Sequence, residues 1–161
     1  MQKKVKTRGF AELIPLLVAD VYQLAGAFRQ WGDGIAGEVG QTQARWQVLS
    51  AASVGGRTVA QLARRLGYAR QSVQRTADLL VTDGLAKYAS NMDHRKSPHL
   101  ELTQHGDDAL KTLTAAAGQE HKKLAAAASA AGVNTTELQT ALDVIRQMCA
   151  AMETKGFATR P

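Results

Sequence analysis

The chain has 161 residues, of which 45% are hydrophobic, enough for one globular domain with its own core. Its single cysteine excludes an internal disulfide and favours a reducing compartment. The net charge of +6 is uneven, because residues 1–38 carry +1, residues 39–105 carry +5 and residues 106–161 carry zero. A basic middle segment is typical of a surface that meets a polyanion, although a solvated charged face gives the same composition.

The first predicted helix runs from about Pro15 to Trp31. Leu13, Leu16 and Val18 add apolar side chains outside the main apolar face of this helix. A helix that is apolar on more than one side is typical of one that packs against a partner chain as well as its own core. The apolar run over 13–18 is too short to span a membrane, and the helical pattern continues without a cleavage-like break. We therefore expect a cytoplasmic protein with no membrane contact.

Residues 32–40 are rich in glycine and are predicted to form a loop. Gly32, Gly34 and Gly37 match the dinucleotide-binding pattern G-x-G-x-x-G, which requires a preceding strand and an acid about 20 residues later. Here a helix precedes, and no Asp or Glu lies between Glu38 and Asp78. A nucleotide site is therefore rejected.

Three short helices are predicted next. The first begins at Thr42, and the second begins at Thr58, which forms a capping box with Gln61. Gly67 ends the second helix, as a glycine just beyond a helix often does. The third runs from about Ala69 to Thr82 with its apolar residues on one side. Its opposite side carries Arg70, Gln71, Gln74 and Arg75.

Two strands are predicted near Leu85–Ala89 and His99–Leu102, joined by a polar tip over 91–98. A long alanine-rich helix over about 104–130 and a last helix over about 135–154 complete the chain. The predicted fold class is mostly helical (α+β). It is a winged helix-turn-helix with a two-stranded β-wing, plus N- and C-terminal helices.

In a winged helix-turn-helix the second helix enters the major groove of DNA. Arginine can bind guanine bidentately there, and glutamine can bind adenine. Arg95 at the hairpin tip could enter a minor groove, held by Asp93 through a charge-assisted hydrogen bond. The plainer interpretations are an ordinary solvated helix face and a flexible polar turn. The predicted DNA-binding residues are Thr58, Arg70, Gln71, Ser72, Gln74, Arg75, Asp93, Arg95 and Lys96.

Three stretches resemble the multiple-antibiotic-resistance regulator (MarR) family of bacterial transcription factors. They are the Trp-containing segment 42–49, the helix-turn-helix over 58–85, and the wing, where Asp93-His-Arg95 precedes Leu100-Glu-Leu-Thr-Gln-His-Gly106. The resemblance covers nearly the whole chain. Two residues depart from the family pattern: Ala69 stands where a Ser or Thr usually caps the recognition helix, and Gln41 replaces a leucine.

The resemblance implies an obligate homodimer whose first, fifth and sixth helices interdigitate. Residues 1–38 and 106–161 would then form the dimerisation region, and residues 39–105 the DNA-binding domain. Such a dimer would bind a palindromic operator with half-sites about 10 bp apart. The apolar stripes of the near-neutral terminal helices agree with this arrangement.

Relatives that the chain resembles commonly release DNA when a small, often aromatic or phenolic, ligand binds. Candidate pocket walls are Tyr22, Phe28, Trp31 and Trp46, which could equally be plain core. The four histidines lack the spacing of metal ligands, and no cofactor is expected. Cys149 lies on an apolar helix face, where a thiol is usually inert.

Three functions remain in competition. The first is a sequence-specific, homodimeric transcription regulator, either a repressor relieved by a small-molecule ligand or an activator. The second is a non-specific DNA-coating protein, which would need the basic segment but no base-reading helix face. The third is a winged-helix dimer that binds other proteins. An enzyme is not expected, because no nucleophile–base pair, metal set or phosphate loop is evident.

Overall fold

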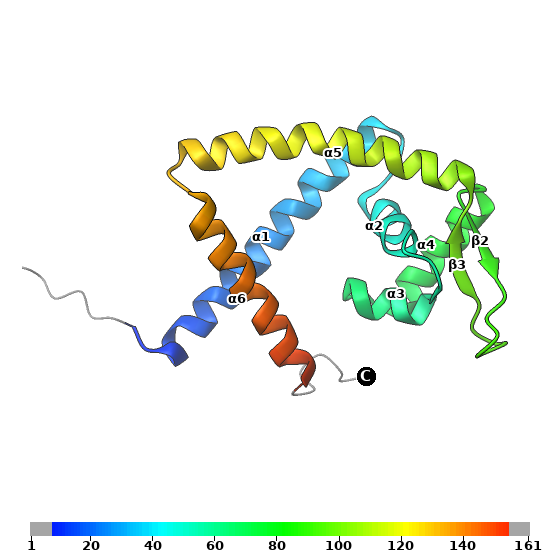
Figure 1. The fold of residues 1–161 in the computed structure, drawn as a ribbon, viewed down its shortest axis with the longest axis horizontal. Coiled ribbons are helices and arrows are strands. Elements are labelled where there is room, and N and C mark those ends of the chain that lie inside the picture. Colours follow the sequence, from blue (N-terminus) through cyan, green and yellow to red (C-terminus); the bar gives the residue numbers. More distant parts are fainter. Residues whose placement is uncertain (1–7, 155–161) are drawn as a thin grey trace, which may run out of the picture. The chain divides into compact units, whose positions relative to one another are not determined.

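The computed structural model describes residues 8–154, so residues 1–7 of the predicted N-terminal segment lie outside the described residues. The chain forms two compact units, Met1–Ala117 and Gly118–Pro161. The mostly helical fold class is confirmed (Figure 1). The elements are α1 (Phe10–Glu38), α2 (Gln43–Ala52), β1 (Arg57–Thr58), α3 (Val59–Leu66), α4 (Arg70–Thr82), β2 (Ala86–Ala89), β3 (His99–Leu102), α5 (Gln104–Ala130) and α6 (Thr135–Thr154).

The predicted β-hairpin is present, and a third strand joins it. β2 and β3 pair antiparallel, and β1 pairs with the other edge of β3, giving the order β1-β3-β2. In β1, Arg57 pairs with Leu100 and Thr58 pairs with His99. A strand of two residues has no alternation of its own, so the sequence pattern did not indicate it.

The expected glycine-rich loop over 32–40 is wrong for most of its length, because α1 continues to Glu38. Ile35 and Ala36 are buried and supply the core contact that offsets the helix-weakening effect of the neighbouring glycines. Gly32 is itself buried, with the side chain of Gln43 packed where its Cβ would stand. The helix also begins earlier than predicted, so Pro15 lies inside it.

The core of the first unit lies between the helix-turn-helix and the sheet. It is formed by apolar residues from α2, α3, α4, β3 and α5 that are almost completely buried. These are Val48, Leu49, Leu62, Val73, Leu80, Leu100 and Leu113. Each comes from the apolar face of its element, so the core positions the opposite faces of α4 and the hairpin toward solvent.

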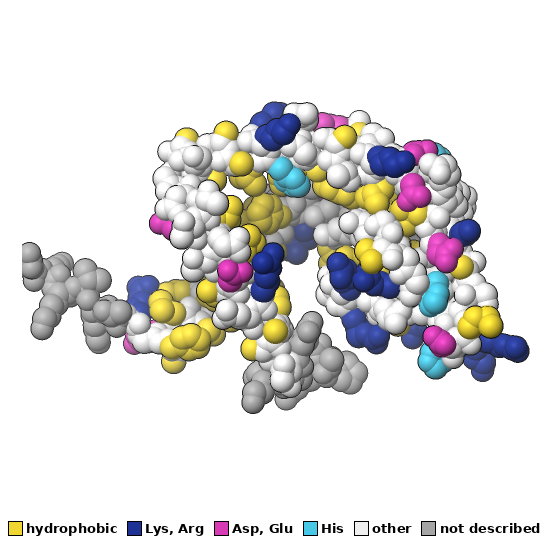
Figure 2. Space-filling view, viewed as in Figure 1, with side chains coloured by type: hydrophobic (Ala, Val, Ile, Leu, Met, Phe, Trp, Pro, Cys, Tyr) yellow, Lys and Arg dark blue, Asp and Glu magenta, His cyan; other side chains and the backbone are white. Residues whose placement is uncertain are grey.

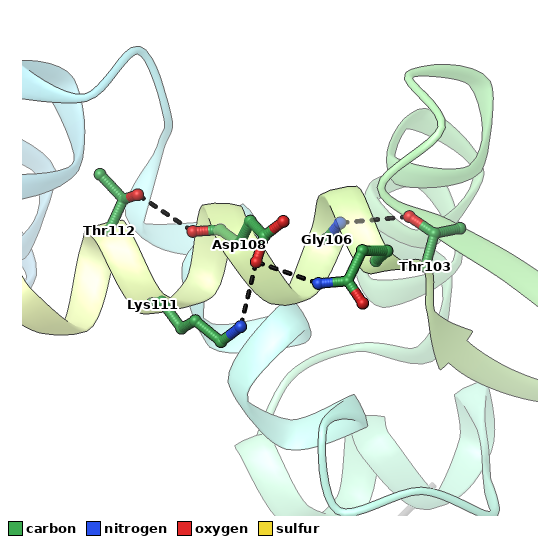
Figure 3. A network of polar contacts seen from close by, with 6 residues as sticks. Thr103, Gly106, Asp108, Lys111 and Thr112 are labelled. Atoms are coloured by element: carbon green, nitrogen blue, oxygen red, sulfur yellow. Dashed lines mark hydrogen bonds and ion pairs between the residues drawn. The ribbon is translucent and has the colours of Figure 1, made fainter.

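The start of α5 is fixed by hydrogen bonds at Thr103 (Figure 3). The Thr103 hydroxyl accepts from the backbone N–H of Gly106 at 3.1 Å and donates to the carbonyl of Gly84 at 2.6 Å. One turn later Asp108 accepts from Lys111 at 3.0 Å and from Gln104. The hydrogen bond from Lys111 holds the pKa of Asp108 below its usual value.

The terminal helices expose apolar side chains within the single chain. On α1 they are Leu13, Leu16, Val18, Val21, Leu24 and Phe28, and on α6 they are Leu138, Leu142, Val144, Ile145 and Met152. By length and composition α1 could also cross a membrane. A single such helix carries little weight, because signal sequences and helices of soluble proteins meet the same criterion.

Candidate nucleic-acid interface

The turn between α3 and α4 sets their relative orientation. α3 begins with the predicted capping box, in which Thr58 Oγ1 accepts from the Gln61 backbone and Gln61 Oε1 accepts from the Thr58 backbone. It ends at Gly67, whose φ of 68° lies in the left-handed region that favours glycine. The hydroxyl of Tyr68 then donates to Gln47 Oε1 at 2.6 Å, which ties the turn to α2.

α4 begins without a side-chain cap. Ala69 occupies the N-cap position in an extended conformation, with φ −59° and ψ 135°, and its carbonyl accepts from Ser72 and Val73. The helix therefore starts where the sequence predicts, in spite of the missing hydroxyl. Val73, Ala77 and Leu80 are buried, which turns the opposite face of α4 to solvent.

A shallow hollow lies along the solvent face of α4. Arg70, Gln71, Ser72 and Arg75 are exposed, and Gln74 is half-buried. In the space-filling view, Lys and Arg side chains gather over the helix-turn-helix and at the hairpin tip (Figure 2). The structure thus brings the predicted residues of α4 onto one surface. The hollow is lined by Arg70, Gln71, Gln74, Arg75, Asp78, Leu79 and Thr82.

Gln74 is not a free side chain on this surface. Its Nε2 lies 2.9 Å from Asp78 Oδ1 and 2.7 Å from the hydroxyl of Tyr88 in β2. The Tyr88 hydroxyl also lies 2.6 Å from Asp78 Oδ1. Burial and the neighbouring Asp78 carboxylate raise the pKa of Tyr88 to about 12. Sequence reasoning missed Tyr88 and Asp78, because neither is marked by a motif.

The hairpin tip is organised by Asn91, which is only 4% exposed. Its Nδ2 donates to the carbonyl of Ser97 at 2.8 Å, and its Oδ1 accepts from the backbone N–H groups of Asp93 and His94. The expected pairing of Asp93 with Arg95 is absent among the ion pairs of residues 8–154. A backbone held by Asn91 leaves the Arg95 side chain exposed at the tip.

A second hollow, of about 350 Å³, lies between the end of α1 and the start of α5. Arg45 forms an ion pair with Asp83 at 2.6 Å there, which joins α2 to the end of α4. Gln41 Oε1 and Arg45 Nε are buried without a hydrogen-bond partner. His105, Ala109 and Thr112 line the opposite wall.

The four predicted ligand-pocket residues line neither hollow. Tyr22 is 73% exposed, Phe28 and Trp31 form a tilted ring pair with centroids 6.1 Å apart, and Trp46 packs against the core. Cys149, which the sequence pattern places on an apolar helix face, is exposed in the single chain. Within residues 8–154 no group of three or more His, Cys, Asp or Glu could hold a metal ion.

Comparison with known proteins gives consistent matches. Residues 40–96 match the model of the MarR family. Uncharacterized proteins of Mycobacterium tuberculosis and Mycobacterium bovis are 46% identical over 140 residues, which is 87% of this chain and 94% of theirs.

Two similar solved structures carry ligands. A mutant MarR from E. coli complexed with operator DNA has a TM-score of 0.69 at 19% identity, covering 88% of this chain and 99% of that one. A Staphylococcus aureus MarR in complex with salicylate and kanamycin has a TM-score of 0.70 at 14% identity, covering 90% and 95%. At these sequence identities, the structural similarity shows only that this chain shares their fold.

Proposed function

Because the chain belongs to the MarR family of winged-helix transcription regulators, we propose that it binds a palindromic DNA operator as a homodimer and represses transcription. The observation that carries this proposal is the solvent face of α4, where arginine and glutamine side chains surround a hollow. The hairpin tip adds the exposed side chains of Arg95 and Lys96. The surrounding segment 39–105 carries +5 of the chain's +6 charge. Both features suit a charged, base-reading surface.

In this docking, α4 lies in the major groove and the hairpin tip follows the adjacent minor groove. Arg70 and Arg75 offer guanidinium groups to guanine, while Gln71 and Ser72 follow Arg70 in the first turn of α4. Arg95 and Lys96 meet the minor groove or its phosphates. Asn91 holds the backbone of the tip at Asp93 and His94, and Thr58, at the start of α3, offers a hydroxyl that can donate to a phosphate.

The homodimer rests on the apolar side chains of the terminal helices. Leu24 of α1 is 51% exposed and Leu138 of α6 is 54% exposed in the single chain. Exposed apolar stripes of this extent are typical of subunit interfaces. We assign dimerisation to segments 1–38 and 106–161 and DNA binding to segment 39–105.

We further propose that a small aromatic or phenolic ligand relieves repression by binding to the protein. The salicylate complex of the S. aureus protein is in line with this. Tyr22, Phe28, Trp31 and Trp46 supply aromatic surface for such a ligand. The hollow beside Arg45 supplies buried donor and acceptor atoms without protein partners, which a polar ligand could satisfy.

The test is selection of bound sequences from a random duplex pool, followed by titration of the selected duplex across salt concentrations. We expect a palindrome with half-sites about 10 bp apart. An Arg70→Ala/Arg75→Ala variant should lose enrichment, whereas Lys111→Ala removes an exposed charge on α5 and should retain it. Salt-sensitive binding without an enriched sequence would favour the DNA-coating alternative, and no binding at any salt concentration would favour a protein partner.

A further inference from the structure

The segment 39–77 contains six arginines and no acidic residue. Two of the six are engaged within the protein. Arg45 forms the ion pair with Asp83, and Arg57 donates to the carbonyl of Ala51 at 3.0 Å. The other four are exposed and form no ion pair within the described residues 8–154. They are Arg64, Arg65, Arg70 and Arg75.

The four exposed arginines lie on two different helices. Arg70 and Arg75 line the hollow along α4. Arg64 and Arg65 are not part of that lining, and they lie in the last turn of α3. The side of α3 that is buried in the core is formed by Val59, Leu62 and Ala63. The base-reading role proposed for α4 therefore leaves the two arginines of α3 without a function.

The position of α3 in the helix-turn-helix decides which part of DNA its side chains can reach. When the second helix of such a unit lies in the major groove, the first helix crosses the sugar-phosphate backbone. Here α3 is the first helix and α4 is the second, and they are joined by the turn at Gly67. Exposed side chains of α3 would then lie closer to phosphates than to base edges.

The charges of Arg64 and Arg65 are available to a phosphate, because neither side chain has to leave an acidic partner first. Consecutive residues of an α-helix point about 100° apart. The two guanidinium groups are thus suited to separate phosphates, and we expect one contact from each. Contacts of this kind strengthen binding to DNA of any sequence and fix the orientation of the protein on the duplex.

We propose that Arg64 and Arg65 bind phosphates of the DNA backbone and so hold α3 across the strand while α4 lies in the groove. They contribute affinity at every sequence, whereas Arg70 and Arg75 contribute the preference among bases. This inference rests on the proposed DNA-binding function. A simpler role for two cations in the last turn of a helix is to stabilise the negative end of its dipole, and the experiment separates the two roles.

The experiment measures affinity for the selected duplex across salt concentrations for the wild type, Arg64→Ala and Arg65→Ala. Each phosphate contact contributes about 0.9 to the slope of log K against log salt concentration. A dimer carries each residue twice, so each variant should make the slope shallower by about 2. The double variant should change it by about twice as much and should still enrich the wild-type sequence. Alanine suits a helix, so α3 should still form.

Lys122→Ala is the matched control for the loss of one positive charge. Lys122 on α5 is exposed and forms no ion pair within residues 8–154. Because it lies outside the helix-turn-helix, its removal should leave the salt slope of the wild type. Arg64→Lys/Arg65→Lys should also keep that slope, because lysine binds phosphate as a point charge.

A wild-type slope in Arg64→Ala/Arg65→Ala would overturn the proposal, and a lower unfolding temperature alongside it would assign both arginines to the helix dipole. A changed base preference in this variant would place them on the bases and would also overturn it. If the wild type binds duplexes without enriching a sequence, the proposed sequence-specific function fails, but the slopes on any one duplex still decide the role of Arg64 and Arg65. If the wild type binds no duplex, both fail.

Discussion

Gly106 in α5 packs directly against the carbonyl group of Leu85, at the start of the hairpin. A Cβ at position 106 would overlap the Leu85 oxygen and lie 2.9 Å from its carbonyl carbon. That carbonyl cannot easily move away, because it accepts a hydrogen bond from the Thr103 backbone at 3.1 Å. The absence of a side chain at position 106 therefore lets α5 approach the wing.

Gly106→Ala should destabilise the fold by about 2–3 kcal/mol, because the clash is with backbone rather than with a flexible side chain. Gly118→Ala is the control in the same helix, since its Cβ would meet nothing within 4 Å. It should stabilise by up to about 1 kcal/mol through helix propensity. Urea unfolding of the two variants measures both effects, and equal midpoints would contradict the close approach.

Ala69→Ser should stabilise the protein by about 0.5–1 kcal/mol, because Ala69 holds an N-cap position with no side-chain hydrogen bond. A serine hydroxyl there can accept from the exposed backbone N–H groups of the first turn of α4. Thr42→Ala gives the opposite comparison, since Thr42 Oγ1 accepts from the Arg45 backbone at 3.3 Å. Thermal unfolding should shift upward for Ala69→Ser and downward for Thr42→Ala.

Asn91→Ala should loosen the hairpin tip and cost about 1–2 kcal/mol, because it removes three hydrogen bonds centred on one buried amide. Asn91→Asp keeps the acceptor for the Asp93 and His94 backbone but sets a buried carboxylate oxygen against the Ser97 carbonyl, so it should cost at least as much as Asn91→Ala. Hydrogen exchange of the tip amides reports the change. Wild-type protection in Asn91→Ala would show that the tip is held by other contacts.

Tyr88 should titrate at higher pH than an ordinary phenol, since its pKa is raised to about 12. A raised pKa means that the folded state favours the neutral phenol. Its contribution to stability is therefore complete below about pH 10 and is lost as pH rises toward 12. Because the side chain is more than a third exposed, solvent screening limits this contribution to about 1 kcal/mol or less.

The measurement is the tyrosinate absorbance of the wild type minus that of Tyr88→Phe as pH is raised. The difference should show a midpoint well above 10, and Asp78→Ala should lower it by removing the neighbouring carboxylate. A midpoint near 10 in the wild type would mean that the hydrogen bonds among Gln74, Asp78 and Tyr88 do not persist in solution.

The sequence predicted those helix boundaries that are set by residues close to one another along the chain. The capping box at Thr58 and the left-handed glycine Gly67 are where the pattern places them. Each involves residues within a few positions, so sequence alone suffices. The DNA-contacting roles and the dimer stay predictions.

Features decided by distant contacts could not be predicted in the same way. The continuation of α1 depends on burial of Ala36 in the core formed with residues later in the chain. The engagement of the Gln74 amide depends on Tyr88, 14 positions away on another element. Helical periodicity gives the side of α4 on which Gln74 lies, but not the partners of its amide group.

β1 has a mechanical consequence, because Thr58 belongs to two elements at once. It pairs with His99 in the sheet and caps the first turn of α3. The base of the hairpin is therefore fixed to the helix-turn-helix. Only the part of the hairpin beyond His99, toward the tip, is free to bend. The loop over 53–56 should accommodate an inserted residue without a change in the surrounding fold. An insertion between Thr58 and Val59 would instead shift the base of the wing relative to the recognition helix.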